Sequence, residues 1–343
     1  MKAIMQSFDQ DNLCEVTRGN LTESMHRGHI AVVDNKGKLI ACAGNPRHYG
    51  YMRSTAKLLQ AIPLLEARGD EQFGLTEAET ALCCSSHGGE PEHTAAVQSI
   101  LHKLGLTESA LACGRQEPLY KPSADELKQK SLQPSQLHNT CSGKHAGMLV
   151  LAKAMNVSIK QYTRLEHPVQ QKMLHIISFM CGVSTENIGV GTDGCGVPVF
   201  AVPLSALAYA YARLGAPDEL AAQRAAACRK IIHVIGRHPY YVAGTNRFDT
   251  RLAEVTQGRV IGKMGAEGVY ALAVPDRGIG LAVKIEDGAE RALYPTAAEA
   301  LVQLEALTRE EAGRLAEFHY PKVMNRRGET VGSIRPSFQL RQP

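Results

Sequence analysis

Apolar residues gather in short runs near both ends of the chain and in longer helix-like segments in its middle. Residues 29–33 and 38–43 are apolar runs on either side of the turn sequence Asp34-Asn35-Lys36-Gly37, which predicts a β-hairpin. Similar β-rich runs separated by turn residues predict three more strands near the C-terminal end, at 259–263, 268–274 and 278–285.

The middle of the chain predicts helices. Residues 54–69 carry a broad apolar face that ends at Gly69, and Pro63 is expected to kink or break this helix. Thr76 and Glu79 have the spacing of a capping box, which marks the start of a short helix. Further helical segments are predicted at about 94–104, 204–214 and 218–234, and after a second capping box at Thr308 and Glu311.

This order of elements predicts an α/β (α+β) fold. Strands from both chain ends can join one mostly antiparallel sheet, and the helices between them form a second lobe. We expect residues 1–320 to form a single catalytic unit, with a sheet lobe at about 1–52 and 240–320 and a helical lobe at about 53–239. Residues 321–343 are expected to be a C-terminal extension, loose or supported by a partner. The cleft between the lobes is a natural place for a site.

Composition narrows the class of protein. The chain has 343 residues, of which 44% are hydrophobic and 21% charged, as in ordinary globular proteins. Its net charge of +4 comes from scattered basic residues, so neither a nucleic-acid nor a membrane partner is expected. The N-terminal residues lack the apolar core of a signal peptide, and the longest apolar stretch is too interrupted to span a bilayer. A cytoplasmic location is therefore expected.

The nine cysteines form no regular disulfide framework, and most should be reduced in a cytosolic protein. Most lie in apolar or helical contexts, where they are expected to be small buried residues. Cys141 and Cys195 differ because they lie in Gly-rich polar loops, where packing explains them less well.

A serine and a lysine three residues apart, Ser54 and Lys57, are the first candidate chemistry. Positions i and i+3 share one helix face, so Lys57 is expected to reach the Ser54 hydroxyl and act as its base. Chance supplies about one such spacing in a chain of this length, and a helix start with an exposed lysine is the competing interpretation. Five segments rich in small and polar residues shift the balance towards a site: 53–57, 85–93, 139–147, 191–200 and 262–268.

These segments resemble the serine-type L-asparaginase II family, the thermolabile bacterial class. The matching stretches are RSTAK, the Ser86-His87 step before GEPEH, NTCSGKHAGML, TDGCGVPVFAVPLSALA, GKMGAEG, EVTRGNLTESMHRGHIAVVD and VAGTNRF. The resemblance covers the chain roughly from Cys14 to Leu293. It implies a fold like that of serine β-lactamases and penicillin-binding proteins, a homodimer, and L-asparagine as the small-molecule partner.

The resemblance also implies catalytic roles. Ser54 would be the nucleophile and Lys57 its base, while Ser86 and Lys263 would form a second Ser-Lys pair that passes protons to the departing ammonia. Ser54 would attack the side-chain amide, and water would then hydrolyse the acyl-serine to L-aspartate. A turn serine that bonds its own backbone is the structural alternative for Ser86.

Charged residues in the same segments are candidates for binding the substrate. Arg53 or His145 could hold the α-carboxylate, and Asp193 is the best placed by motif for the α-ammonium. Glu90 is a second candidate for the ammonium, or else a surface acid.

By resemblance, Cys141, Lys144 and Cys195 match positions that bind zinc near the active site. Two thiolates suit zinc, but a lysine ligand must first lose its proton. We therefore expect zinc, if bound, to tune binding and not to be required for the chemistry.

The chain departs from the family pattern at Asn246, Asp249 and Met264, where glycine, cysteine and glycine are the more common residues. These departures bear on substrate affinity more than on chemistry. Three other functions stay open: a serine-dependent glutaminase, a β-lactam-interacting or D,D-peptidase-type serine acyltransferase, and a non-catalytic zinc-binding protein.

Overall fold

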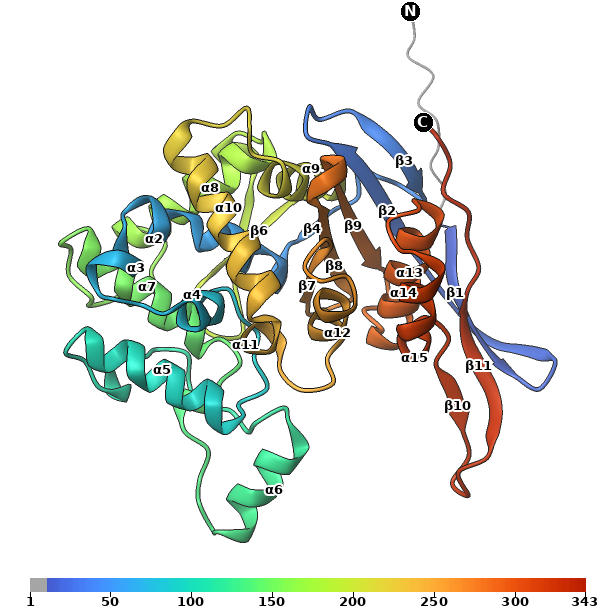
Figure 1. The fold of residues 1–343 in the computed structure, drawn as a ribbon, viewed down its shortest axis with the longest axis horizontal. Coiled ribbons are helices and arrows are strands. Elements are labelled where there is room, and N and C mark those ends of the chain that lie inside the picture. The colour runs from blue at the N-terminus through green and yellow to red at the C-terminus, as the bar shows by residue number, and fades with distance from the viewer. Residues whose placement is uncertain (1–10) are drawn as a thin grey trace, which may run out of the picture.

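The computed structural model describes residues 11–343, and an eight-stranded sheet lies at its centre (Figure 1). The strands of this sheet are β1 (Asp11–Arg18), β2 (Leu21–Asp34), β3 (Leu39–Ala43), β7 (Ile261–Gly265), β8 (Val269–Val274), β9 (Ile279–Ile285), β10 (Lys322–Met324) and β11 (Thr330–Pro336). Their order is β10-β11-β1-β2-β9-β8-β7, with β3 also paired to β2, and every pair is antiparallel. A second sheet has the order β4-β6-β5, from β4 (Tyr49–Tyr51), β5 (Gly189–Thr192) and β6 (Pro198–Pro203).

Most helices lie in the middle of the sequence, and three more lie between β9 and β10 near the C-terminus. The α-helices are α1 (Lys57–Gln60), α2 (Ile62–Glu66), α3 (Gly69–Gln72), α4 (Glu77–Cys83), α5 (Pro91–Lys103), α6 (Lys121–Gln129), α7 (Ser142–Ala154), α8 (Pro168–Cys181), α9 (Leu204–Gly215), α10 (Ala222–Arg237), α11 (Pro239–Ala243), α12 (Phe248–Val255), α13 (Glu290–Gln303), α14 (Arg309–Arg314) and α15 (Ala316–His319). Short 3₁₀ helices are η1 (Arg53–Ala56), η2 (Glu108–Ala110), η3 (Gln136–His138), η4 (Thr185–Asn187) and η5 (Pro275–Arg277). In Figure 1 the helices α2 to α5, α7, α8 and α10 gather on one side of the sheet. The predicted fold class, a mostly antiparallel sheet from both chain ends with a helical lobe between them, is confirmed.

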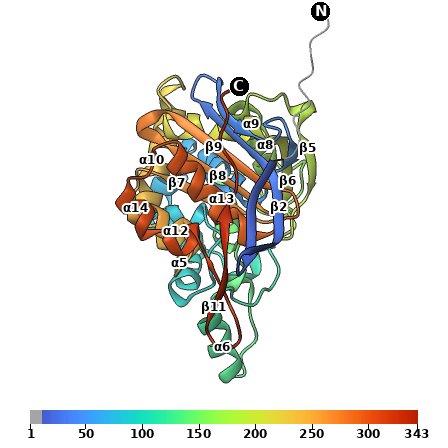
Figure 2. The ribbon, with the colours of Figure 1, turned by 90° about the vertical axis from the view of Figure 1, so that its right-hand side faces the viewer.

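The two faces of the central sheet are packed differently. Helix α9 covers one face of the sheet, and α13 covers the other face (Figure 2). Small residues point to α9, and larger apolar residues point to α13. The small set is Ala31, Ala271, Ala273 and Ala282, and the large set includes Ile30, Val32, Leu272, Leu281 and Val283. Because both faces are buried, the strands read as continuous apolar runs in the sequence.

Most of the predicted elements are present, but β2 begins at Leu21 and not at residue 29, and α10 begins at Ala222 and not at residue 218. The hairpin of β2 and β3, the three strands β7, β8 and β9, and both capping boxes are confirmed. The helix predicted from Ser54 to Gly69 is instead broken into η1, α1 and α2. Pro63 lies in the first turn of α2, where its missing N–H and fixed φ are tolerated.

The prediction of a loose C-terminal extension was wrong. β11 pairs with β1, β10 pairs with β11, and the backbone of Arg341 bonds with Cys42 on β3. The last residues thereby satisfy the edge of β1, whose backbone groups would otherwise face solvent unpaired. Residues 1–10, which belong to the predicted sheet lobe, lie outside the described residues.

Two expectations about the rest of the chain can be compared with residues 11–343. No helix there combines the length and apolar character needed to cross a membrane. All nine cysteines are buried free thiols.

Gly280 on β9 is required by the close approach of α9. A Cβ at this position would lie 2.0 Å from the Ala208 carbonyl oxygen and 2.4 Å from the Ala212 nitrogen. We expect Gly280→Ala to lower the free energy of unfolding by about 3 kcal/mol, because α9 must shift off the sheet. Gly313→Ala, in exposed α14 with open space around it, should raise stability by about 0.5 kcal/mol. Denaturant titration measures both, and equal effects would contradict the packing described here.

Candidate active site

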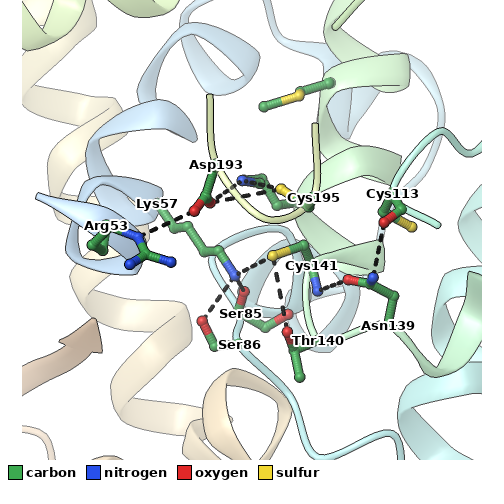
Figure 3. Close-up of polar contacts among 12 residues, drawn as sticks. Arg53, Lys57, Ser85, Ser86, Cys113, Asn139, Thr140, Cys141, Asp193 and Cys195 are labelled. Atoms are coloured by element: carbon green, nitrogen blue, oxygen red, sulfur yellow. Dashed lines mark hydrogen bonds and ion pairs between the residues drawn. The ribbon is translucent and has the colours of Figure 1, made fainter. Parts of the chain in front are cut away.

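Lys57, the first residue of α1, is a buried cation at the junction of three segments. Its Nζ donates to the Ser85 carbonyl oxygen at 2.7 Å, to the Ser86 Oγ at 2.8 Å and to the Cys141 Sγ at 3.3 Å (Figure 3). Ser85 and Ser86 follow α4, and Cys141 precedes α7. The three acceptors match the three N–H groups of an ammonium, which repays part of the cost of burying it.

This arrangement differs from the predicted pairs. Among the hydrogen bonds of residues 11–343, none joins Lys57 Nζ to the hydroxyl of Ser54, because the three acceptors take up its donors. Ser86 pairs with Lys57, whereas the sequence predicted a pair with Lys263. Ser54 remains one turn before Lys57, and its carbonyl accepts the Lys57 backbone N–H.

The backbone just before Ser54 is strained. Arg53 has a φ of +49°, a left-handed conformation that non-glycine residues seldom adopt. Hydrogen bonds hold the segment on either side of it: the Met52 N–H donates to the Phe200 carbonyl, and the Tyr211 hydroxyl donates to the Thr55 carbonyl at 2.7 Å. Strain that its surroundings enforce in this way is typical of functional sites.

Lys263, on β7, is a second buried cation. Its Nζ donates to the carbonyl oxygen of Met264 at 2.9 Å and lies 3.6 Å from the Asp249 Oδ2. Burial, opposed by the charge of Asp249 and assisted by that of Lys57, lowers the pKa of Lys263 to about 8. An amine with such a pKa changes protonation near physiological pH, as proton-transfer groups require.

Arg53 and Asp193, predicted to bind opposite ends of the substrate, bind each other in the structure. Arg53 Nε lies 3.2 Å from Asp193 Oδ1 (Figure 3). Lys144 Nζ lies 3.6 Å from Asp193 Oδ2. Burial raises the pKa of Asp193, but the charges of Lys144 and Arg53 outweigh it and leave this pKa lowered. Asp193 is therefore a carboxylate at neutral pH.

His145, on α7, does not fit the predicted cation for the α-carboxylate. Burial and then the charge of Lys144 lower its pKa to about 3, so the ring is neutral at physiological pH. Its Nδ1 lies 2.6 Å from the Tyr162 hydroxyl, while its Nε2 is buried without a hydrogen-bond partner among the described residues. His145 can thus offer one neutral hydrogen bond but no charge.

The predicted metal ligands do come together, and Asp193 joins them. The Sγ atoms of Cys141 and Cys195 and a carboxylate oxygen of Asp193 all lie within 4.8 Å of one another. A hydrogen bond from Cys195, aided by the charges of Lys57 and Lys144, outweighs burial and lowers the pKa of Cys141. The pKa of Cys195 is raised by its hydrogen bond to Cys141 and by burial. One thiolate, one thiol and one carboxylate suit a thiophilic divalent ion such as zinc.

Lys144 fits this donor set less well. Its Nζ donates to Cys195 Sγ at 3.1 Å. Burial lowers its pKa, but the charges of Cys141 and Asp193 and the hydrogen bond to Cys195 outweigh burial and raise it. Lys144 is therefore an ammonium that already neutralises the site, and it could coordinate a metal only after losing its proton.

Glu90 is a buried residue, so its interpretation as a surface acid was wrong. Its two carboxylate oxygens accept from Thr245, one from the backbone N–H at 2.9 Å and one from the hydroxyl at 2.6 Å. It also precedes Pro91 as the N-cap of α5. The Glu-Pro step at a helix start was the signal in the sequence that could have indicated this structural role.

The most important residue that sequence reasoning undervalued is Asp249, which was noted only as a departure. It is buried on α12, beside Lys263. An isolated Asp in a helical segment gives no signal of this, because burial depends on how α12 packs against β7.

A model of the L-asparaginase II family matches residues 14–336. Among solved structures, Mglu in its native form is 16% identical, with 87% of this chain and 69% of that chain covered and a TM-score of 0.46. A β-lactamase from Mycobacterium bovis is 15% identical, with 82% and 95% covered and a TM-score of 0.43. No curated protein matches this chain.

The donor set predicts that zinc binding displaces protons. Because Cys195 and Lys144 are protonated, binding should release about one proton per ion or more, and affinity should rise with pH. Calorimetric titration with Zn²⁺ in buffers of different ionisation enthalpy measures this release. Cys195→Ser should weaken binding at least about tenfold, whereas Cys42→Ala, on β3, should not. Equal binding by both variants would contradict the site.

Proposed function

Because the chain belongs to the L-asparaginase II family, we propose that it is an L-asparaginase, which hydrolyses the side-chain amide of L-asparagine to L-aspartate and ammonia through an acyl-serine. The family match supports an asparaginase-type amidohydrolase that acts on a small-molecule substrate. The observation that carries the proposed mechanism is the 2.8 Å hydrogen bond between buried Lys57 and the Ser86 hydroxyl. Lys57 lies one helical turn after Ser54.

In the proposed reaction Ser54 attacks the amide carbonyl and a tetrahedral oxyanion forms. Backbone N–H groups, one of them from Ser54 itself, would stabilise that oxyanion. Collapse of the intermediate releases ammonia and leaves the acyl-serine. Water then hydrolyses the ester to give aspartate.

Proton transfer in this scheme runs through Lys57. To accept the proton of Ser54, the amine must first be neutral, so one of its three hydrogen bonds must be given up. The Ser86 hydroxyl is hydrogen-bonded to the Lys57 amine and can pass the proton on to the departing ammonia. Lys263, with a pKa of about 8, would supply or take up the proton at the next step.

Substrate recognition would exchange one ion pair for two. L-Asparagine is a zwitterion. Its α-carboxylate can take the place of Asp193 beside Arg53, and its α-ammonium can take the place of Arg53 beside Asp193. Arg53 would then hold the carboxylate and Asp193 the ammonium. His145 Nε2 has no hydrogen-bond partner within residues 11–343, and in this proposal it donates a further hydrogen bond to the carboxylate.

Zinc is not needed for these steps. When bound, an ion held by Cys141, Cys195 and Asp193 would supply positive charge near the substrate's binding groups. Lys144 would join as a ligand only in its neutral form. The homodimer and the cytoplasmic location remain predictions from the sequence.

Glutamine is the nearest alternative substrate. It differs from asparagine by one methylene, which changes binding by only about 1–3 kcal/mol. Parallel ammonia assays with the two amino acids decide between them. A chromogenic β-lactam tests the acyltransferase alternative, and unfolding on chelation would favour the non-catalytic zinc protein.

Ser54→Ala should abolish ammonia release from L-asparagine. Loss of the nucleophile is expected to lower kcat by about 10³-fold or more, with the fold retained. A coupled ammonia assay measures the rate, and Ser109→Ala, an exposed serine, is the matched control. Full activity in Ser54→Ala would remove Ser54 from its proposed role.

Ser86→Ala tests the proton path separately. Loss of the relay hydroxyl should lower kcat by about 10²-fold, the usual contribution of a positioned acid–base group, with little change in KM. Steady-state kinetics on both amino acids measures the split. A variant that instead raises KM at constant kcat would place Ser86 in substrate binding.

A further inference from the structure

The Lys263 ammonium is part of a closed ring of contacts with Met264 and Asp249. Lys263 Nζ donates to the Met264 carbonyl at 2.9 Å, the Met264 N–H donates to Asp249 Oδ2 at 3.1 Å, and that same oxygen lies 3.6 Å from Lys263 Nζ. The side chains of Lys263 and Asp249 are 1% and 5% exposed. The ring therefore ties β7 to α12 through a buried ion pair.

The other oxygen of Asp249 is a costly feature. Oδ1 is buried without a well-formed hydrogen bond among the described residues, and so is the hydroxyl of Tyr270 on β8. Burial, then the charge of Asp249 and hydrogen bonding to its carboxylate, raise the pKa of Tyr270, so Asp249 also acts on β8. Two apolar residues would join α12 to β7 at less cost than a buried carboxylate with one poorly hydrogen-bonded oxygen.

We propose that Asp249 is a positioning residue that holds the Lys263 ammonium in place for proton transfer. This inference rests on the proposed function, since Lys263 relays protons only if the chain is an amidohydrolase. Asp249 touches neither Ser54 nor Ser86 in the described contacts, so it acts through Lys263. Its Oδ2 atom holds the amine from α12 by charge, while the carbonyl of Met264 holds it from β7 by a hydrogen bond.

A purely structural clasp between α12 and β7 is the alternative. The two differ in what happens to the proton on Lys263. The charged groups that act on this amine are Asp249 from α12, Lys57 from α1, Arg247 just before α12, and Cys141. Asp249 favours the ammonium, whereas Lys57 and Arg247 disfavour it.

The experiment follows the Lys263 amine directly. In protein with isotopically labelled lysine, NMR titration reports each amine, and Lys263→Met identifies the Lys263 signal. Asp249→Asn should lower the pKa of Lys263 by about one unit or more, because an opposite charge within reach is removed. The limb of the ammonia-release pH profile that belongs to Lys263 should move in the same direction, with kcat reduced and KM little changed.

Asp70→Asn is the matched control. Asp70 is a buried carboxylate that pairs with Lys230, and it lies on α3, away from β7 (Figure 1). It should lose stability without moving the Lys263 titration. If Asp249→Asn does not fold, Asp249→Glu, which keeps the charge but displaces it, decides. The proposal then requires a pKa close to that of the wild type and a reduced kcat.

Two outcomes overturn the proposal. One is an unchanged Lys263 titration in Asp249→Asn; the other is an unchanged kcat in Asp249→Glu when the wild type is active. Failure of the proposed function is recognised separately, since the wild type would then release no ammonia while the NMR titration could still be measured.

Discussion

The buried ammonium of Lys57 is the interaction on which the rest of the site depends. A charge removed from water must be met by acceptors, and here they come from the loop after α4 and from the start of α7. Those segments are far apart in the sequence and are packed together by the helical lobe. Lys57 thereby links Ser86 on one of these segments to Cys141 on the other.

The sheet brings the second lysine to the first. Its face of small residues lets α9 approach closely, and α9 in turn supplies Tyr211, which bonds the backbone of η1. Gly265 on β7 allows the same closeness, since a Cβ there would lie 3.1 Å from the Met52 carbonyl oxygen. The segment carrying Ser54 can thus lie directly against the strand that carries Lys263.

Elements that rest on local chemistry could be predicted from the sequence. The hairpin turn and both capping boxes depend on residues a few positions apart, and these predictions hold. The partner of Lys57 could not be predicted, because helical spacing favours Ser54 while tertiary packing supplies Ser86. The neutral state of His145 escaped prediction for the same reason, since burial and the charge of Lys144 come only with the fold.

The position of β11 has a consequence for how the chain is made. β1 lies between β2 and β11, and β2 also pairs with β9, so Gly28 meets Ile285 and Val16 meets Ile334. During synthesis the hairpin of β1 and β2 therefore emerges from the ribosome long before β9 and β11 exist. The edges of β1 and β2 stay unpaired until β9 and β11 have been made, and unpaired strand edges expose a nascent chain to aggregation.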